Sequence, residues 1–294
     1  TDMSPGITKH INLYKHENKN VLLKDKIWDE LLSRHKVVKT TYPVSWSGLF
    51  GKFSYLMEKY NIEKTNLVIF GRGNRKKIAE SRYRLYSDFR NKKLASNTVY
   101  IIDNLSHLRH LKYLFKNENV SFFYRDNFWI MTMDEKEHIS KSDKNIFNNI
   151  RPKILEINEV KNLNFKDKDN YYGFGWSHNL SEGGIWSEGQ KSTLLFRTEK
   201  SYEALTIEIF CKPYVTEKNE ILEFDIYINN FLNKTVKLKN EDKIEILVEK
   251  KFMNKNEIKI DFDFKNSISP YEVFESPDSR KLGILAKNIK ISPI

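Results

Sequence analysis

Apolar and polar residues alternate in short runs from residue 192 to the end of the chain, and this pattern constrains the fold most strictly. The runs are separated by turn residues at near-regular spacing: STLLFRT, EALTIEIFCK, ILEFDIYIN, KTVKLK, KIEILVE, EIKIDFDF and LGILAKNIKIS. A period of two places successive side chains on opposite faces of a strand. This half therefore predicts an antiparallel, jelly-roll-like β-sandwich, with a core face that includes Leu222, Phe224, Ile226 and Ile228.

The first half has a different pattern, in which β-prone runs alternate with helical ones. The expected strands are 20–24, 36–42, 65–70 and 97–103, followed by a hairpin over 120–133 with its turn at Asp126-Asn127. The expected helices are 25–34, 47–60, 74–90 and 105–116; the last two have inward stripes formed by Ile78, Leu85 and Phe89, and by Leu108, Leu111 and Phe115. Such alternation is typical of βαβ units, so we expect a small α/β domain with a parallel sheet.

The two patterns define the expected domain boundaries. Residues 1–134 form the α/β domain, and residues 169–294 form the sandwich. Between them, residues 135–168 are rich in charge and asparagine and show no periodicity, which indicates a linker or an outer excursion.

The net charge of +11 belongs to the first half of the chain. Lys and Arg outnumber Asp and Glu by 27 to 16 in residues 1–150, and the two kinds are equal at 23 each in residues 151–294. Nine basic and two acidic residues fall within 72–93. This segment is either a patch for an anionic partner, such as a glycan or an anionic membrane surface, or an ordinary solvated face. It matches no recognised nucleic-acid module, so no nucleic-acid partner is expected.

Other features limit the function classes. A single cysteine, Cys211, excludes a disulfide framework and a zinc site built from cysteines. No run approaches the roughly 18 apolar residues that a membrane span needs. The first residues show neither an initiator Met nor a signal-peptide pattern, so we expect a trimmed piece of a longer protein. Known nucleophile, metalloprotease and diphosphate–metal motifs are missing from the sequence, and no cofactor or metal is expected.

The best catalytic candidate follows the expected strand 65–70. Its backbone NH groups and side chains, at the start of a helix, suit a phosphate or carboxylate: Gly71, Arg72, Gly73, Asn74 and Arg75. The segment is neither a Walker loop nor a complete GxGxxG, and an ordinary glycine turn explains it as well. Asp103 and Tyr42 end other expected strands and are placed on the same rim, where open α/β sheets bind ligands. His107 and His110 lie three apart on one helix without a third metal ligand.

Residues 171–196, YYGFGWSHNLSEGGIWSEGQKSTLLF, concentrate aromatic residues and glycines. One reading buries both Trp176 and Trp186 as plugs of the open end of the sandwich. The other makes one indole a platform for a sugar ring, with hydrogen bonds from nearby polar side chains: His178, Asn179 and Glu182. We expect Trp186 to be the structural tryptophan and Trp176 the ligand contact.

Near the C-terminus, the segment SPDSRKLG contains a carboxylate and a guanidinium two residues apart. Asp278 and Arg280 are expected to form a charge-assisted pair that fixes the corner before the last strand, and Gly283 to permit a close approach.

Three segments carry a resemblance to a known family. The opening GFGWSHNLSEGGIWSEGQKSTLLF, the hairpin IYINNFLNKTVKL and the ending SPYEVFESPDSRKLGILAKNIKIS resemble the accessory β-sandwich domain of bacterial surface-polysaccharide glycosyltransferases and related multi-pass envelope proteins. The hairpin has Asn229-Asn230 in place of the family's Asn-Gly turn. TDMSPG and the α/β half also resemble the soluble C-terminal region of polysaccharide-associated multi-pass membrane proteins.

The resemblance implies a region on the periplasmic or extracellular face of a bacterial membrane, anchored by helices outside this chain. Its partner would be a glycan or lipid-linked sugar, and its expected role is to assist synthesis, modification or export of a surface glycan by binding. The alternative is a transferase or hydrolase that acts on an anionic glycan at the rim formed by Gly71–Asn74; no catalytic residue is assigned.

Overall fold

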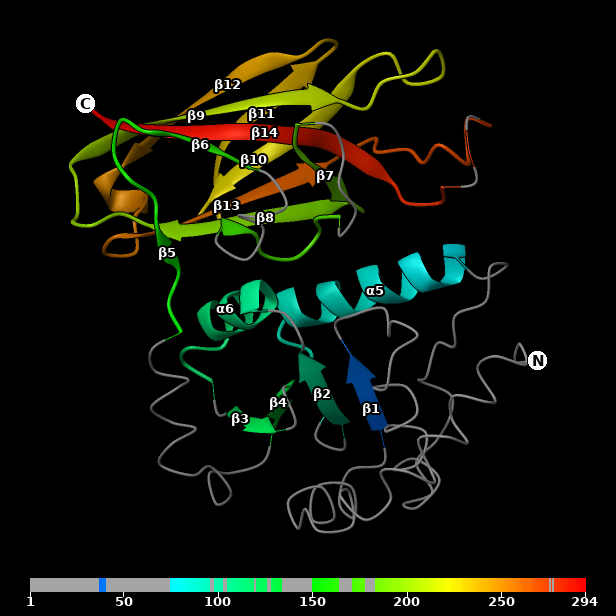
Figure 1. The fold of residues 1–294 in the computed structure, drawn as a ribbon, viewed down its shortest axis with the longest axis vertical. Helices are drawn as coiled ribbons and strands as arrows, with labels where there is room; N and C mark the ends of the chain where they lie inside the picture. The colour runs from blue at the N-terminus through cyan, green and yellow to red at the C-terminus, as the bar shows by residue number, and fades with distance from the viewer. Residues whose placement is uncertain are drawn as a thin grey trace. The chain divides into compact units, whose positions relative to one another are not determined.

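The computed structural model describes residues 37–40, 75–95, 98–102, 105–118, 120–125, 128–133, 150–163, 171–177, 183–274, 276 and 278–294. It divides the chain into two compact units, Thr1–Ile150 and Arg151–Ile294 (Figure 1). The second unit therefore begins inside the segment that the sequence pattern assigns to a linker.

The described part of the first unit contains a mixed sheet. Its strands are β1 (Val37–Thr40), β2 (Thr98–Ile102), β3 (Ser121–Arg125) and β4 (Phe128–Thr132), in the order β1-β2-β4-β3. β1 pairs with β2 in parallel, but β4 pairs antiparallel with both β2 and β3. The expected hairpin over 120–133 is thus joined to β2 through the antiparallel strand β4. The expected parallel sheet is not confirmed.

Two helices belong to the same unit, α5 (Arg75–Arg90) and α6 (Leu105–Leu114). The predicted inward stripes are confirmed where they are described, because these side chains are buried: Leu85, Phe89, Leu108, Leu111 and Phe115. The side chain of Ile78 lies outside the described residues, as do the expected strands 20–24 and 65–70 and the expected helices 25–34 and 47–60.

The second unit is a β-sandwich. In its described residues, sheet I has the order β11-β10-β13-β8-β5, and sheet II has the order β12-β9-β14-β6 with β7 also paired to β14. The strands of sheet I are β5 (Lys153–Ile154), β8 (Lys191–Arg197), β10 (Leu222–Ile228), β11 (Phe231–Leu238) and β13 (Glu257–Phe264). Those of sheet II are β6 (Val160–Asn162), β7 (Ile185–Glu188), β9 (Ala204–Pro213), β12 (Asp242–Glu249) and β14 (Leu282–Pro293), and a short 3-10 helix, η4 (Lys250–Phe252), follows β12.

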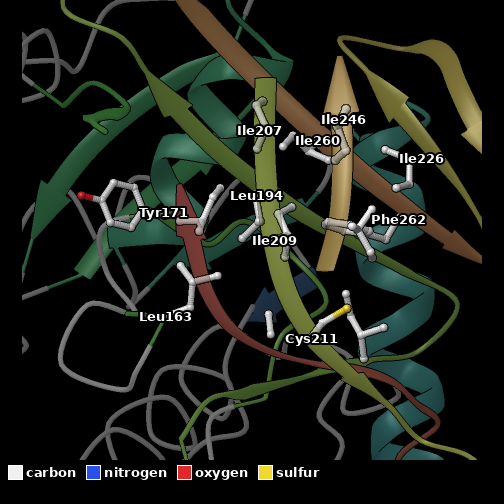
Figure 2. Packing of buried hydrophobic residues seen from close by; sticks show 14 of the residues in the cluster. Leu163, Tyr171, Leu194, Ile207, Ile209, Cys211, Ile226, Ile246, Ile260 and Phe262 are labelled. Carbon is white, nitrogen blue, oxygen red and sulfur yellow. The ribbon is translucent and has the colours of Figure 1, made fainter. Parts of the chain in front are cut away.

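Alternate residues of these strands form one apolar core between the sheets. Figure 2 shows Ile207, Ile209 and Cys211 along β9, together with Leu194 of β8 and Phe262 of β13. The predicted core face of β10 is confirmed, since Leu222, Phe224, Ile226 and Ile228 are at most 1% exposed. Burying each such side chain contributes roughly 1.5–3 kcal/mol, so the period-two pattern provides most of the driving force for this unit.

The segment Tyr171–Ser177 connects the two sheets at one edge. Toward sheet I, Gly173 N donates to Thr193 O (2.8 Å) and Thr193 N donates to Phe174 O (3.0 Å). Toward sheet II, Ser177 N donates to Trp186 O (2.8 Å) and Glu188 N donates to Gly175 O (2.6 Å). This clasp, residues 171–177, therefore satisfies backbone groups of β8 and β7 at the same time.

Part of the expected linker is built into the sandwich. β5 pairs in parallel with β8, and β6 pairs antiparallel with β14. These strands are short and mostly exposed, so they show no period-two pattern in the sequence. Their neighbours Leu155 and Leu163 are fully buried in the core and anchor the segment.

Among the residues that the structure describes, no helix is both long and apolar enough to cross a membrane.

Candidate functional site

Trp176 is a core residue of the sandwich. Its side chain is 4% exposed, and its Nε1 donates a hydrogen bond to Thr193 O (2.7 Å). Its ring packs edge-on against Tyr172 and Phe262, at centroid distances of 5.0 and 6.1 Å. An indole with a buried face and a used donor offers no platform to a sugar. The expectation that Trp176 is the exposed member of the pair is therefore wrong.

Trp186 lies on the opposite side of its sheet. Its neighbour Ile185 points into the core, and because side chains alternate along β7, Trp186 points to the outer face of sheet II, where it is half-buried. Its ring meets that of Tyr214 edge to face, with centroids 5.9 Å apart and planes at 89°. The expected roles of the two tryptophans are thus exchanged. Ile185, the first residue of β7, points into the core, and Trp186 next to it must therefore point outward.

Cross-strand register collects further side chains around this pair. Trp186 is paired with Leu285 of β14, which is paired in turn with Lys212 of β9. Lys212 and Phe210 are exposed and share the outward side of β9, while Leu285 is 6% exposed between its neighbours. We call this surface the aromatic face: Trp186, Tyr214, Leu285, Lys212 and Phe210.

The charges around the aromatic face are mostly paired. Glu208 accepts a hydrogen bond from Lys243 (2.5 Å), and this bond lowers the pKa of Glu208. Lys287 forms an ion pair with Glu241 (2.6 Å). Lys212 is exposed and has no ion-pair partner among the described residues. The face therefore presents a ring pair beside one uncompensated ammonium group, which suits a ligand with CH surfaces and oxygen acceptors.

Cys211, beside this face on β9, points inward and is chemically inert. Burial raises the pKa of its thiol to about 12, with smaller contributions from the negative charges of Asp242 and Glu241. A thiol in this state is not a nucleophile at neutral pH.

The remaining sugar-contact candidates of the glycine-rich segment, His178, Asn179 and Glu182, lie outside the described residues. The anion-site candidates Gly71, Arg72, Gly73 and Asn74 and the rim residues Asp103 and Tyr42 also lie outside them. Arg75 begins α5, but its side chain is not among those described.

His107 and His110 are both buried on α6, at 2% and 0% exposure. The ring of His107 packs edge-on against Tyr86 of α5, with centroids 5.4 Å apart. Within the described ranges, no group of three or more His, Cys, Asp or Glu side chains is arranged to hold a metal ion. We therefore read these histidines as part of the packing between the two helices.

The predicted pair at the corner before β14 is confirmed. Arg280 donates from Nε to Asp278 Oδ1 (2.9 Å) and from Nη2 to Asp278 Oδ2 (2.5 Å). Its Nη1 also reaches Ser177 Oγ (2.5 Å) and Glu188 Oε1 (3.0 Å), so the corner is joined to the clasp and to β7. Burial opposes the charge of Arg280, but hydrogen bonding to Asp278 and the charge of Glu188 raise its pKa above the usual value.

The prediction for Gly283 is also confirmed. A Cβ at this position would lie 2.6 Å from the Phe264 ring and 2.7 Å from Ser187 Oγ, so only glycine admits both neighbours. The corner is a structural lock that fixes the end of the sandwich beside the aromatic face.

The described part of the second unit thus defines a mostly antiparallel β-sandwich, in which only the strand β5 pairs in parallel, with an aromatic pair on one outer face. No family model and no curated protein matches the sequence.

Among solved structures, the chain is similar to a carbohydrate-binding module of family 36 in complex with calcium and xylotriose, at 7% identity and a TM-score of 0.31, over 46% of this chain and 99% of that module. It is also similar to a family 36 domain of a multidomain xylanase from the hindgut metagenome of Trinervitermes trinervoides. The identity is 9% and the TM-score 0.31, over 46% of this chain and 98% of that domain. A family 35 carbohydrate-binding module from Clostridium thermocellum matches at 8% identity and a TM-score of 0.30, over 45% of this chain and 97% of that module. Identities this low carry no residue assignment from those modules to this chain.

Proposed function

We propose that the second unit is a non-catalytic glycan-binding domain and that the aromatic face is its binding surface. Sugar rings present patches of CH groups that pack on aromatic faces, and their hydroxyl groups accept and donate hydrogen bonds at the edges. The aromatic face combines a half-buried indole and an exposed ammonium on sheet II with a second ring, Tyr214, directly after β9. A site built on strands holds these groups in place before a ligand arrives, which lowers the entropic cost of binding.

The observation that carries this proposal is the outward orientation of the Trp186–Tyr214 pair. An edge-to-face contact fixes the Trp186 ring against Tyr214 and keeps it from packing into the core. Trp176 performs the structural role instead, since it is buried and hydrogen-bonded. The sandwich therefore has no packing requirement for a second tryptophan at position 186.

Binding of soluble polysaccharides to the intact chain tests the proposal. Titrations followed by calorimetry and by tryptophan fluorescence should identify a bound glycan in a panel of bacterial surface polysaccharides. Trp186→Ala should weaken that binding by about 30-fold, the size expected of a hot-spot aromatic worth about 2 kcal/mol. Phe231→Ala is the matched control, because Phe231 is 57% exposed at the opposite end of the sheets.

Two results would contradict the proposal. One is a correctly folded Trp186→Ala variant that binds the glycan as well as the parent chain does. The other is an absence of binding to every polysaccharide in the panel.

The biological setting is part of the same proposal. The resemblance of the sandwich segments to accessory domains of polysaccharide glycosyltransferases supports a role in synthesis, modification or export of a bacterial surface glycan. In this setting, the chain lies on the outer side of the membrane and belongs to a longer, membrane-anchored protein. Fractionation of cells that carry the full gene product should place it in the membrane fraction and leave the sandwich accessible to external protease; a cytoplasmic product would contradict this setting.

A further inference from the structure

The aromatic face continues along the chain into a rigid, exposed loop. Tyr214 leads directly into a turn closed by two backbone hydrogen bonds between Thr216 and Asn219, at 3.1 and 3.0 Å. Lys218 lies in this turn and is exposed. Because it follows Tyr214 by four residues, its Cα lies within about 14 Å of that of Tyr214.

Lys218 contacts a further aromatic residue, the exposed Phe274. Its Nζ lies over the ring of Phe274, 4.6 Å from the centroid. Phe274 is 88% exposed and has a φ of +63°, a left-handed conformation that is unusual for a bulky side chain. An exposed ring gains little from burial, and a left-handed backbone at a bulky residue persists only where the surroundings impose it, so folding alone does not explain the placement of Phe274.

The loop that carries Phe274 is held by a network of hydrogen bonds. The backbone N and Oγ of Ser269 both donate to Glu272 Oε2, at 2.8 and 2.9 Å. Tyr271 N donates to Asp278 O (2.8 Å), and Asp278 is fixed by Arg280. The ring of Phe274 is thus presented on a preorganised support, as in binding hot spots.

The charges along this path favour an anionic ligand. Lys212 and Lys218 are exposed, and neither forms an ion pair within the described part of the chain. Of the nearby acids, Glu220 is paired with Lys239 (3.7 Å), Glu272 accepts hydrogen bonds from Ser269, and Glu217 is exposed beside Lys218. Two ammonium groups therefore alternate with ring surfaces along the path from sheet II to the loop.

We propose that these side chains form one continuous track for an extended acidic polysaccharide: Lys212, Trp186, Tyr214, Lys218 and Phe274. This inference rests on the proposed function and specifies its ligand class. Pyranose rings pack on the aromatic groups, and the carboxylates of uronic-acid-type units pair with the two lysines. We expect the track to select polymers over single sugars, because a polymer can contact Trp186 and Phe274 at the same time.

The charge of the ligand is tested with polygalacturonate, alginate and hyaluronate, each beside its carboxyl-reduced form. At least one acidic polymer should bind more tightly than its neutral form, with an affinity that falls as salt rises. The double variant Lys212→Gln/Lys218→Gln should remove most of this salt dependence and weaken binding of the acidic polymer much more than binding of the reduced polymer. Lys255→Gln, at an exposed lysine on the opposite end of the sandwich, should bind as the parent chain does.

The length of the ligand is tested with oligomers of the polymer that binds. Phe274→Ala should weaken binding of an eight-unit oligomer by about tenfold and that of a two-unit oligomer by less than twofold, as expected when one of two linked contacts is lost. Glu217→Gln should strengthen binding of the long acidic oligomer, because it removes the opposing charge beside Lys218. Phe231→Ala should change neither.

Several outcomes would overturn the track. Equal affinity for an acidic polymer and its reduced form, or equal losses in Phe274→Ala for long and short oligomers, would contradict it. If only neutral polymers bind and this binding depends on Trp186, the result supports the glycan-binding domain and contradicts the acidic track. If a polysaccharide of the bacterial panel binds in a Trp186-dependent way and none of the three acidic polymers does, the acidic track is contradicted and the glycan-binding domain is not.

Discussion

At the scale of single residues, Trp176 and Trp186 show how one side chain type performs two roles ten positions apart. Trp176 belongs to the clasp, where its indole closes the core and its Nε1 satisfies Thr193 O. Trp186 belongs to β7, where alternation directs it outward to Tyr214. Composition and flanking residues suggest the opposite assignment, because Trp176 has polar neighbours in sequence. Only the register of β7 against β14 distinguishes them.

The two tryptophans should respond differently to truncation. Trp176→Ala removes a buried ring and a hydrogen bond to a buried carbonyl, so it should lower the free energy of unfolding by about 3–5 kcal/mol. Trp186→Ala removes a half-buried ring and should cost clearly less. Chemical denaturation of the two variants measures both values under the same conditions. A Trp176→Ala variant as stable as the parent chain would contradict the structural role.

At the scale of elements, the clasp depends on glycine at one specific place. Gly175 has a φ of +88°, and a Cβ there would lie 2.1 Å from Lys191 O. The close approach is required by the hydrogen bonds that join the clasp to β8 and β7, including Ser192 Oγ to Gly175 O (2.5 Å). Conformational strain and steric exclusion therefore act together at this residue.

Gly183 provides the matched comparison. Its φ is +75°, but a Cβ there would meet no described atom within 4 Å. Gly183→Ala should therefore cost only backbone strain, about 1 kcal/mol, whereas Gly175→Ala should cost at least about 3 kcal/mol because the clasp must also move. Thermal melts followed by circular dichroism compare the two variants. Equal losses of stability would show that the steric contact with Lys191 O does not add to the cost of Gly175→Ala.

The β10–β11 hairpin explains a departure from the expected turn sequence. Asn229 and Asn230 have φ values of +47° and +79°, which an Asn-Gly pair would also adopt. The side chains, however, are in use. Asn229 Nδ2 donates to Phe252 O (2.7 Å), and Asn230 Oδ1 accepts from Nζ of the buried Lys259 (2.7 Å). Asparagine at the second position thus helps to satisfy a buried ammonium group, which glycine could not do.

Elements with a strong local pattern could be predicted from the sequence, and those defined by pairing could not. The long strands β8 to β14 follow the period-two runs, because each buries apolar side chains of one face in the core, although β11 does so only at Val236 and Leu238. β5 and β6 have only two and three residues and are held by their partners rather than by their own apolar residues. The sense of β4 and the outward direction of Trp186 likewise depend on strand register, which no local pattern contains.

At the scale of the molecule, the boundary of the sandwich unit is set by the core and not by the change of pattern. Leu155 and Leu163 are fully buried in the core, although both precede the expected start of the domain at residue 169. Their strands also cover backbone at the edges of both sheets, since β5 pairs with β8 and β6 pairs with β14. Residues 151–163 are therefore part of the smallest stable unit.

Two fragments of different length test this boundary. Residues 151–294 should fold cooperatively on their own, because they contain the complete core and both sheets. Residues 169–294 lack two buried leucines, each worth about 2–5 kcal/mol, and should lose at least about 4 kcal/mol of a total that is typically 5–15 kcal/mol. The double variant Leu155→Ala/Leu163→Ala of the longer fragment should fall between the two, since it keeps the β5 and β6 backbone. Circular dichroism melts and limited proteolysis provide the comparison. If the shorter fragment melts at the same temperature as the longer one, the boundary lies at residue 169 and β5 and β6 are not needed for stability.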